Sequence, residues 1–160
     1  MTFSNDGPLV LSEAAKIILI ASVTLAAGFT WHGIRAARIP VASPERLIAE
    51  LRLAQIGALL LALTAGAYIG FAVTHENQPG SGLDIALAVG FFLVAAATLV
   101  RDPRQALTII ALAFAAHAVV DVIHRPGGLP DGIAPRWYAL GCAVFDVYVG
   151  AVAYFPILRR

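Results

Sequence analysis

The chain has 160 residues, of which 59% are hydrophobic and 13% are charged, and its formal net charge at pH 7 is +1. Soluble domains carry about 25% charged residues, so this composition predicts a protein that crosses a membrane several times. The near-neutral charge and the lack of a basic tract argue against a nucleic-acid partner. The single cysteine excludes an intramolecular disulfide framework and a cysteine-rich metal site.

Five apolar runs are each long enough to cross the hydrocarbon core, which needs about 20 helical residues. We expect these transmembrane helices at about 14–35, 48–74, 83–100, 105–124 and 137–157. The prediction is therefore an all-α integral membrane protein, with residues 1–160 forming one compact five-helix domain. The first run, from Ile17, is interpreted as a mature helix, because no basic segment precedes it and no clear Ala-x-Ala cleavage site follows it.

The second helix has a clear start signal in Ser43, Pro44 and Glu45, which supply a capping hydroxyl, a proline at the first position and an early acid. A helix from Pro44 to His75 would be about 48 Å long, which exceeds the thickness of the hydrocarbon core. The charged residues of its first turns are therefore expected to project into the cytoplasm. These residues are Glu45, Arg46, Glu50 and Arg52.

Two connections are also predicted from composition. The linker 101–104 is so short that the third and fourth helices should form a tight antiparallel hairpin. Residues 125–135 contain three prolines and three glycines, which is typical of a non-helical loop. We expect this loop to lie over the ends of the fourth and fifth helices.

The distribution of Lys and Arg predicts the orientation. With the N-terminus outside, eight basic residues fall on the inner side and three on the outer side. The inner residues are Arg35, Arg38, Arg46, Arg52, Arg101, Arg104, Arg159 and Arg160, and the outer ones are Lys16, Arg125 and Arg136. This bias follows the positive-inside rule and predicts an outer N-terminus and a cytoplasmic C-terminus. The expected location is the cell membrane, as a multi-pass protein of a bacterial inner membrane.

The fourth run carries the most informative pattern, His117, Asp121 and His124. Positions 0, +4 and +7 of a helix lie within about 60° of one another, so the three side chains share one face. One ionisable side chain in hydrocarbon costs about 2.5 kcal/mol or more, so such a stripe indicates function. Asp146 should lie at a similar depth on the neighbouring antiparallel helix. We therefore predict His117, Asp121 and Asp146 as catalytic residues.

Imidazoles and carboxylates also suit Zn²⁺ or another divalent metal. His117, His124 and Asp121, or Asp146 in place of Asp121, could supply three ligands and leave one position open. Without a metal, a buried His–Asp pair is an acid–base couple. The spacing matches no established zinc motif.

Structural interpretations stand beside these. His117 and Asp146 could simply pin two helices together by a hydrogen bond, and Cys142 is interpreted as a small buried hydrophobe. A haem between His117 and His75 would need the two imidazoles to face each other. The ridge of Ala62, Gly66 and Gly70 is typical of close helix packing and could equally serve a homo-oligomer or a larger membrane complex.

The sequence therefore leaves three functions open. The first is a small membrane enzyme that acts on a lipid or small amphiphile by hydrolysis or acid–base isomerisation, with or without a metal. The alternative is a non-catalytic accessory or assembly subunit of a larger membrane complex. A transporter or ion-conducting protein ranks last, because the inner halves of the spans lack a continuing polar path.

Overall fold

The structure is a computed structural model that describes residues 12–130 and 132–159. Its regular elements are five helices, and all five are long and apolar enough to cross a membrane. They are α1 (Glu13–Arg38), α2 (Pro44–Thr74), α3 (Ser81–Thr98), α4 (Pro103–Ile123) and α5 (Arg136–Leu158). The prediction of an all-helical chain with five helices long and apolar enough to cross a membrane is thus confirmed. Arg160 and Asp131, which belong to the orientation and loop predictions, lie outside the described residues.

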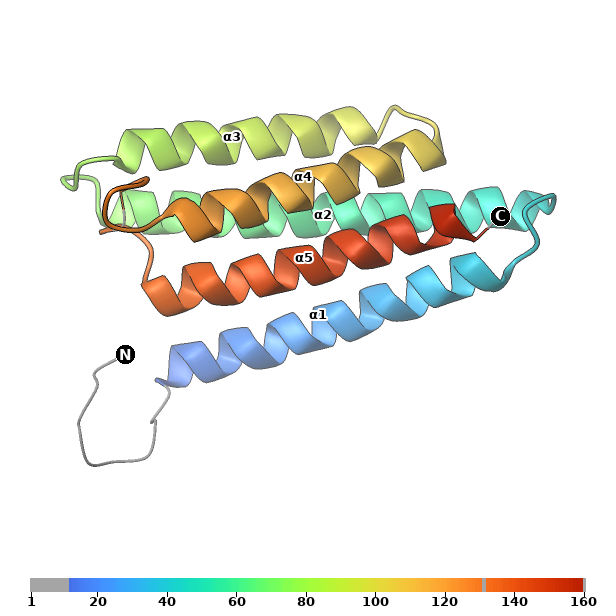
Figure 1. The fold of residues 1–160 in the computed structure, drawn as a ribbon, viewed down its shortest axis with the longest axis horizontal. Coiled ribbons are helices and arrows are strands. Elements are labelled where there is room, and N and C mark those ends of the chain that lie inside the picture. The colour runs from blue at the N-terminus through green and yellow to red at the C-terminus, as the bar shows by residue number, and fades with distance from the viewer. Residues whose placement is uncertain (1–11, 131, 160) are drawn as a thin grey trace.

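The five helices lie side by side and alternate in direction (Figure 1). The starts of α1, α3 and α5 and the last turns of α2 and α4 lie together at what we call the His124 end. The opposite end, which we call the Arg46 end, holds the connections 39–43 and 99–102 and the last turn of α5. The start of α1 and the end of α5 are therefore at opposite ends of the bundle.

The predicted start signal of α2 is confirmed. α2 begins at Pro44, and the Ser43 hydroxyl accepts a hydrogen bond from the Glu45 amide at 3.3 Å. The same arrangement begins α4, where the Asp102 carboxylate accepts from the Gln105 amide at 3.0 Å. In both cases a side-chain oxygen satisfies an amide that has no partner within the helix.

The apolar core lies mainly between α2, α4 and α5, where Leu61, Ile110 and Val149 are fully buried. α4 and α5 approach closely at Gly150, where an added Cβ would lie 3.2 Å from the carbonyl oxygen of Ala111. A side chain at this position would force the two backbones apart. Because Gly150 has no side chain, α4 and α5 can pack closely, and these two helices carry most of the predicted site.

α1 is the most peripheral helix, because it contacts only α2 and α5. Its second half is anchored by buried Phe29, Gly33 and Ala36. Toward the His124 end α1 leans away from α5 (Figure 1). Close packing along α1 is thus confined largely to the half nearer the Arg46 end.

Arg46 and Glu50, two of the charged residues in the first turns of α2, are each only 2% exposed and so lie inside the bundle rather than in solvent. The Arg46 guanidinium donates to the Glu50 carboxylate and to the carbonyl oxygens of Ile39 and Pro156. These carbonyls lie at the C-terminal ends of α1 and α5, where carbonyls lack partners within the helix. Arg46 is therefore buried because it satisfies two helix ends, and Glu50 balances its charge.

The small-residue ridge on α2 has two environments. Gly66 lies against α3, since an added Cβ would be 3.6 Å from Phe92 Cζ. Gly70 is exposed, and nothing lies within 4 Å of the corresponding position. Only part of the ridge is therefore used for packing within the described chain.

Candidate functional site

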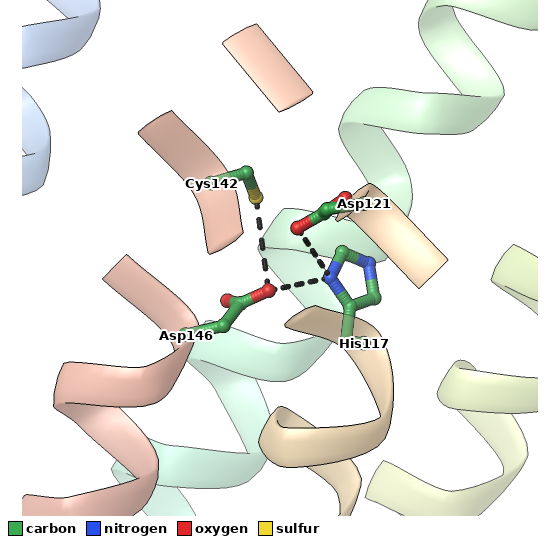
Figure 2. Close-up of side chains that lie close together, drawn as sticks. All are labelled: His117, Asp121, Cys142 and Asp146. Atoms are coloured by element: carbon green, nitrogen blue, oxygen red, sulfur yellow. Dashed lines mark hydrogen bonds and ion pairs between the residues drawn. The ribbon is translucent and has the colours of Figure 1, made fainter. Parts of the chain in front are cut away.

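The centre of the candidate site is a contact between α4 and α5 (Figure 2). His117 Nδ1 lies 2.6 Å from Asp146 Oδ2 and 3.4 Å from Asp121 Oδ2. All three side chains are buried, with at most 2% of each residue exposed. In such apolar surroundings a hydrogen bond between polar groups is electrostatically stronger than in water. One nitrogen of the imidazole, Nδ1, thus faces both carboxylates.

Helical periodicity explains how four side chains meet here. His117 and Asp121 are one turn apart on α4, and Cys142 and Asp146 are one turn apart on α5. Because the two helices are antiparallel neighbours, the pairs face each other. Cys142 Sγ lies 3.9 Å from Asp146 Oδ2, and one ligand atom from each residue lies within 4.8 Å of the others. We call these four residues the α4–α5 cluster.

Tyr68 of α2 holds one side of the cluster in place. Its hydroxyl donates a hydrogen bond to Asp121 Oδ1 at 2.6 Å. The centre of its ring lies 5.7 Å from that of His117, and the Phe91 ring meets the same imidazole edge to face at 4.7 Å. These contacts restrict the rotamers of both His117 and Asp121.

A second histidine–carboxylate pair lies closer to the end of the bundle. His124 Nε2 is 2.9 Å from Asp84 Oδ1 of α3, and its Nδ1 is 2.7 Å from the carbonyl oxygen of Val120. Both ring nitrogens therefore have partners outside the α4–α5 cluster. The structure does not bring His124 together with His117 and Asp121 as the predicted metal-binding set required.

The charges of the cluster are not balanced by the protein alone. Asp121 Oδ2 and Asp146 Oδ1 are buried without a hydrogen-bond partner in the described part of the chain. Within residues 12–130 and 132–159, His117 is the one basic side chain that pairs with these two carboxylates. An unpaired buried charge is costly. The cluster therefore needs either a proton on one carboxylate or a further cation.

An apolar cavity of about 660 Å³ lies between α1, α2 and α5, on the side where α1 leans away (Figure 1). Its walls include Leu25, Leu63 and Phe145, together with Tyr138 and Cys142. Sites for small molecules typically measure about 300–1,000 Å³ and are mostly apolar. Since Cys142 belongs both to the wall and to the α4–α5 cluster, the cavity reaches the cluster at this residue.

The structure thus brings together His117, Asp121 and Asp146, the three residues that the sequence indicated as catalytic. Cys142 joins them, although from the sequence it was interpreted as a small buried hydrophobe. His75 lies exposed at the end of α2, where its Nδ1 is 3.0 Å from the Phe71 carbonyl oxygen. This placement gives no support to a haem between two facing imidazoles.

Sequence reasoning missed Tyr68 and Asp84. The one available signal for Tyr68 was its position inside an apolar span, since a buried tyrosine hydroxyl usually has a partner. Asp84 lies in the first turn of α3, and its pairing with His124 could not be predicted because it depends on how α3 and α4 are rotated about their axes.

Comparison of the chain with protein-family models, with curated proteins and with solved structures finds no match. The chemistry of the site therefore has to be argued from its geometry. A buried imidazole between two carboxylates can hold and transfer a proton, and the same donors, with the thiol, are of the kinds that bind a divalent metal.

Proposed function

We propose that the protein is a small multi-pass membrane enzyme that acts on a lipid or small amphiphile by hydrolysis or acid–base isomerisation. The observation that carries this proposal is that Cys142 lines the apolar cavity while its Sγ lies 3.9 Å from Asp146 Oδ2, in the buried His117–Asp146 pair. Ionisable groups buried in a membrane span are functional by default. Here they lie beside a space large enough for a substrate.

In this proposal His117 and Asp146 form the acid–base couple, because they share the shortest contact of the cluster. Asp121 stands on the other side of the same ring nitrogen and is held there by Tyr68. The negative charge of Asp121 would stabilise the His117 imidazolium after His117 has taken a proton from the substrate. A positioned group of this kind contributes about 10²–10⁴-fold to a reaction rate.

The walls of the cavity support an amphiphilic substrate. They are formed by apolar side chains of three helices that are themselves apolar enough to lie in a membrane. An apolar chain would be favoured there, at about 25 cal/mol for each Å² of apolar surface removed from water. The reacting end of the molecule would then lie against Cys142.

We further propose the orientation and location that the sequence indicates, with an outer N-terminus, a cytoplasmic C-terminus and the inner membrane of a bacterium as the site. The basic residues gathered toward the Arg46 end support this orientation through the positive-inside rule. It would place the α4–α5 cluster in the outer half of the membrane.

The test is conversion of lipids by purified protein. Wild-type protein in detergent is incubated with a polar lipid extract, and products are separated and identified by mass spectrometry. We expect at least one lipid to be converted, and His117→Asn and Asp146→Asn to lower the rate by about 10²–10⁴-fold. Asp84→Asn is the matched control, since Asp84 is also a buried carboxylate with a histidine partner.

A further variant tests the role of the cavity in substrate binding without changing the acid–base residues. Gly141 lies on the cavity wall with nothing within 4 Å of an added Cβ. Gly141→Leu should therefore lower the conversion of long-chain lipids while short-chain analogues still react. Conversion that is equally fast in wild type, Asp146→Asn and the Gly141→Leu variant would contradict the proposal.

The alternative is an accessory subunit of a larger membrane complex. It is favoured by the exposed glycines Gly70 and Gly90, which leave smooth helix surfaces with nothing within 4 Å of an added Cβ. On this alternative the Ala62, Gly66 and Gly70 ridge contacts another chain, either a second copy or a different subunit. Loss of a co-purifying chain in both Gly70→Leu and Gly90→Leu, together with no lipid conversion by wild type, would support it; the second variant is needed because Gly70 also lines the cavity.

A further inference from the structure

The α4–α5 cluster has the geometry of a metal site built between two helices. His117 and Asp121 project from consecutive turns of α4, and Cys142 and Asp146 project from consecutive turns of α5 (Figure 2). Helix bundles hold metals with such pairs of side chains on facing helices. One donor atom from each residue already lies within 4.8 Å of the other three.

The unsatisfied oxygens of the cluster point to the same conclusion. Asp121 Oδ2 and Asp146 Oδ1 are both fully buried and have no hydrogen-bond partner in the described residues. Two ionised carboxylates with one neutral imidazole carry a charge of −2, and Cys142 bound as a thiolate makes the charge of the four ligands −3. A divalent cation would leave a net charge of −1 and so offset most of the electrostatic cost of burying both acids.

The kinds of ligand atom in the cluster indicate which metal ion it would bind. Imidazole nitrogen, carboxylate oxygen and thiol sulfur are the three kinds of ligand that Zn²⁺ accepts, usually in a four-coordinate site. Mg²⁺ and Ca²⁺ prefer sites made of oxygen alone. The neighbouring Asp84–His124 pair offers one carboxylate and one imidazole, and it forms no group of three potential ligands among the described residues.

We infer that the α4–α5 cluster binds a Zn²⁺ ion through His117, Asp121, Cys142 and Asp146. The hydroxyl of Tyr68 orients Asp121 from outside this set, as partners of metal-ligating carboxylates commonly do. The ligand set differs from the one expected from the sequence, because Cys142 and Asp146 on α5 take the place of His124.

The inference names a cofactor for the proposed enzyme, and its catalytic meaning rests on that proposed function. When bound, the ion would supply Lewis acidity, and with four protein ligands it would take a substrate oxygen only by expanding to five-coordinate. Of the four ligands, Cys142 is the one that also lies on the cavity wall. A substrate that enters the cavity therefore meets the site at Cys142. The presence of the ion can be tested without any activity.

The experiment measures metal content and metal affinity of the full chain in detergent. The protein is purified without chelators and without a polyhistidine tag, stripped, and titrated with Zn²⁺ and with Co²⁺. We expect stoichiometric binding by wild type and a loss of affinity of about 100-fold or more in His117→Asn and Asp146→Asn. Cys142→Ser should remove the sulfur-to-cobalt absorption that wild type shows.

Asp84→Asn and His124→Asn serve as matched controls, because they remove the same two residue types from a buried pair outside the cluster. Both should bind Zn²⁺ as wild type does. If His117→Asn or Asp146→Asn fails to fold, the Co²⁺ spectrum of wild type and of Cys142→Ser still tests the ligand set. No stoichiometric binding by wild type, or equal losses in Asp84→Asn and Asp146→Asn, would overturn the inference.

The two proposals can fail separately. Lipid conversion by metal-free protein at the full rate contradicts a catalytic part for the ion and leaves an acid–base enzyme. Stoichiometric zinc in a protein that converts no lipid supports the site and contradicts the proposed function.

Discussion

Tyr68 shows how one hydroxyl on a third helix orders a cluster formed by two others. It is 4% exposed and donates its hydrogen bond to Asp121 across 53 residues of sequence. A buried acceptor that loses its partner costs about 1–3 kcal/mol, and more if it is charged. The position of Asp121 beside His117 therefore depends on this one donor.

We predict that Tyr68→Phe lowers the free energy of unfolding by about 1.5–3 kcal/mol, because the ring stays and Asp121 Oδ1 loses its donor. Zinc affinity should fall by about 10–100-fold, the usual effect of removing a group that orients a metal ligand. Thermal unfolding in detergent and the Zn²⁺ titration measure the two effects.

Tyr148→Phe is the control for this variant. The Tyr148 hydroxyl lies 2.7 Å from Thr30 Oγ1 at an exposed position, and Thr30 also donates to the carbonyl oxygen of Ala26. Removing the Tyr148 hydroxyl therefore leaves no buried polar group without a hydrogen-bond partner. Equal destabilisation by the two substitutions would show that Asp121 does not depend on Tyr68.

For single residues, the sequence predicted which ionisable side chains lie at a similar depth in the membrane. It did not predict all of their hydrogen-bond partners. The spacing of His117 and Asp121 and the depth of Asp146 follow from helical periodicity alone. The partners of His124 and Asp121 lie on α3 and α2, and they depend on how each helix is rotated about its axis. That rotation is determined by packing across the bundle.

At the scale of helices, the site depends on how closely α4 and α5 approach. Gly150 is one turn beyond Asp146, and an added Cβ would lie 3.2 Å from the Ala111 carbonyl oxygen and 3.4 Å from Phe114 Cβ. The first of these is a backbone atom, which cannot rotate away. A side chain at Gly150 must therefore separate the helices near Asp146.

We predict that Gly150→Leu lowers the free energy of unfolding by about 1–3 kcal/mol, the usual cost of overpacking a well-packed site. Zn²⁺ affinity should fall in the same variant, because Asp146 moves away from His117. Gly90→Leu is the matched control, as Gly90 is an exposed helical glycine with open space around it. A stable Gly150→Leu with unchanged zinc affinity would contradict this account of helix spacing.

The five helices could be predicted from hydropathy because each run is long, apolar and ended by polar residues or proline. The burial of Arg46 could not be predicted from the same pattern. A charged first turn normally indicates a solvated helix end, but here the short connection after α1 and the packing of α5 on α2 bring the C-terminal ends of α1 and α5 beside Arg46. The need of those carbonyls for a donor outweighs the hydration of the guanidinium.

At the scale of the whole molecule, basic residues gather at one end of the bundle. Ten of the chain's basic residues lie in the described segments, seven toward the Arg46 end and three toward the His124 end. The seven are Arg35, Arg38, Arg46, Arg52, Arg101, Arg104 and Arg159, and the three are Lys16, Arg125 and Arg136. Because α1 starts and α5 ends at opposite ends, one test of sidedness orients all five helices.

We predict that the His124 end faces the outside and the Arg46 end faces the cytoplasm. Gln78 is exposed in the connection between α2 and α3, and Val100, between α3 and α4, is 84% exposed at the other end. A membrane-impermeant maleimide added to spheroplasts should label Gln78→Cys at once and Val100→Cys only after permeabilisation. Wild type gives the background, since its one cysteine is buried. The reverse pattern would invert the orientation, and labelling of both without permeabilisation would contradict a span between these two positions.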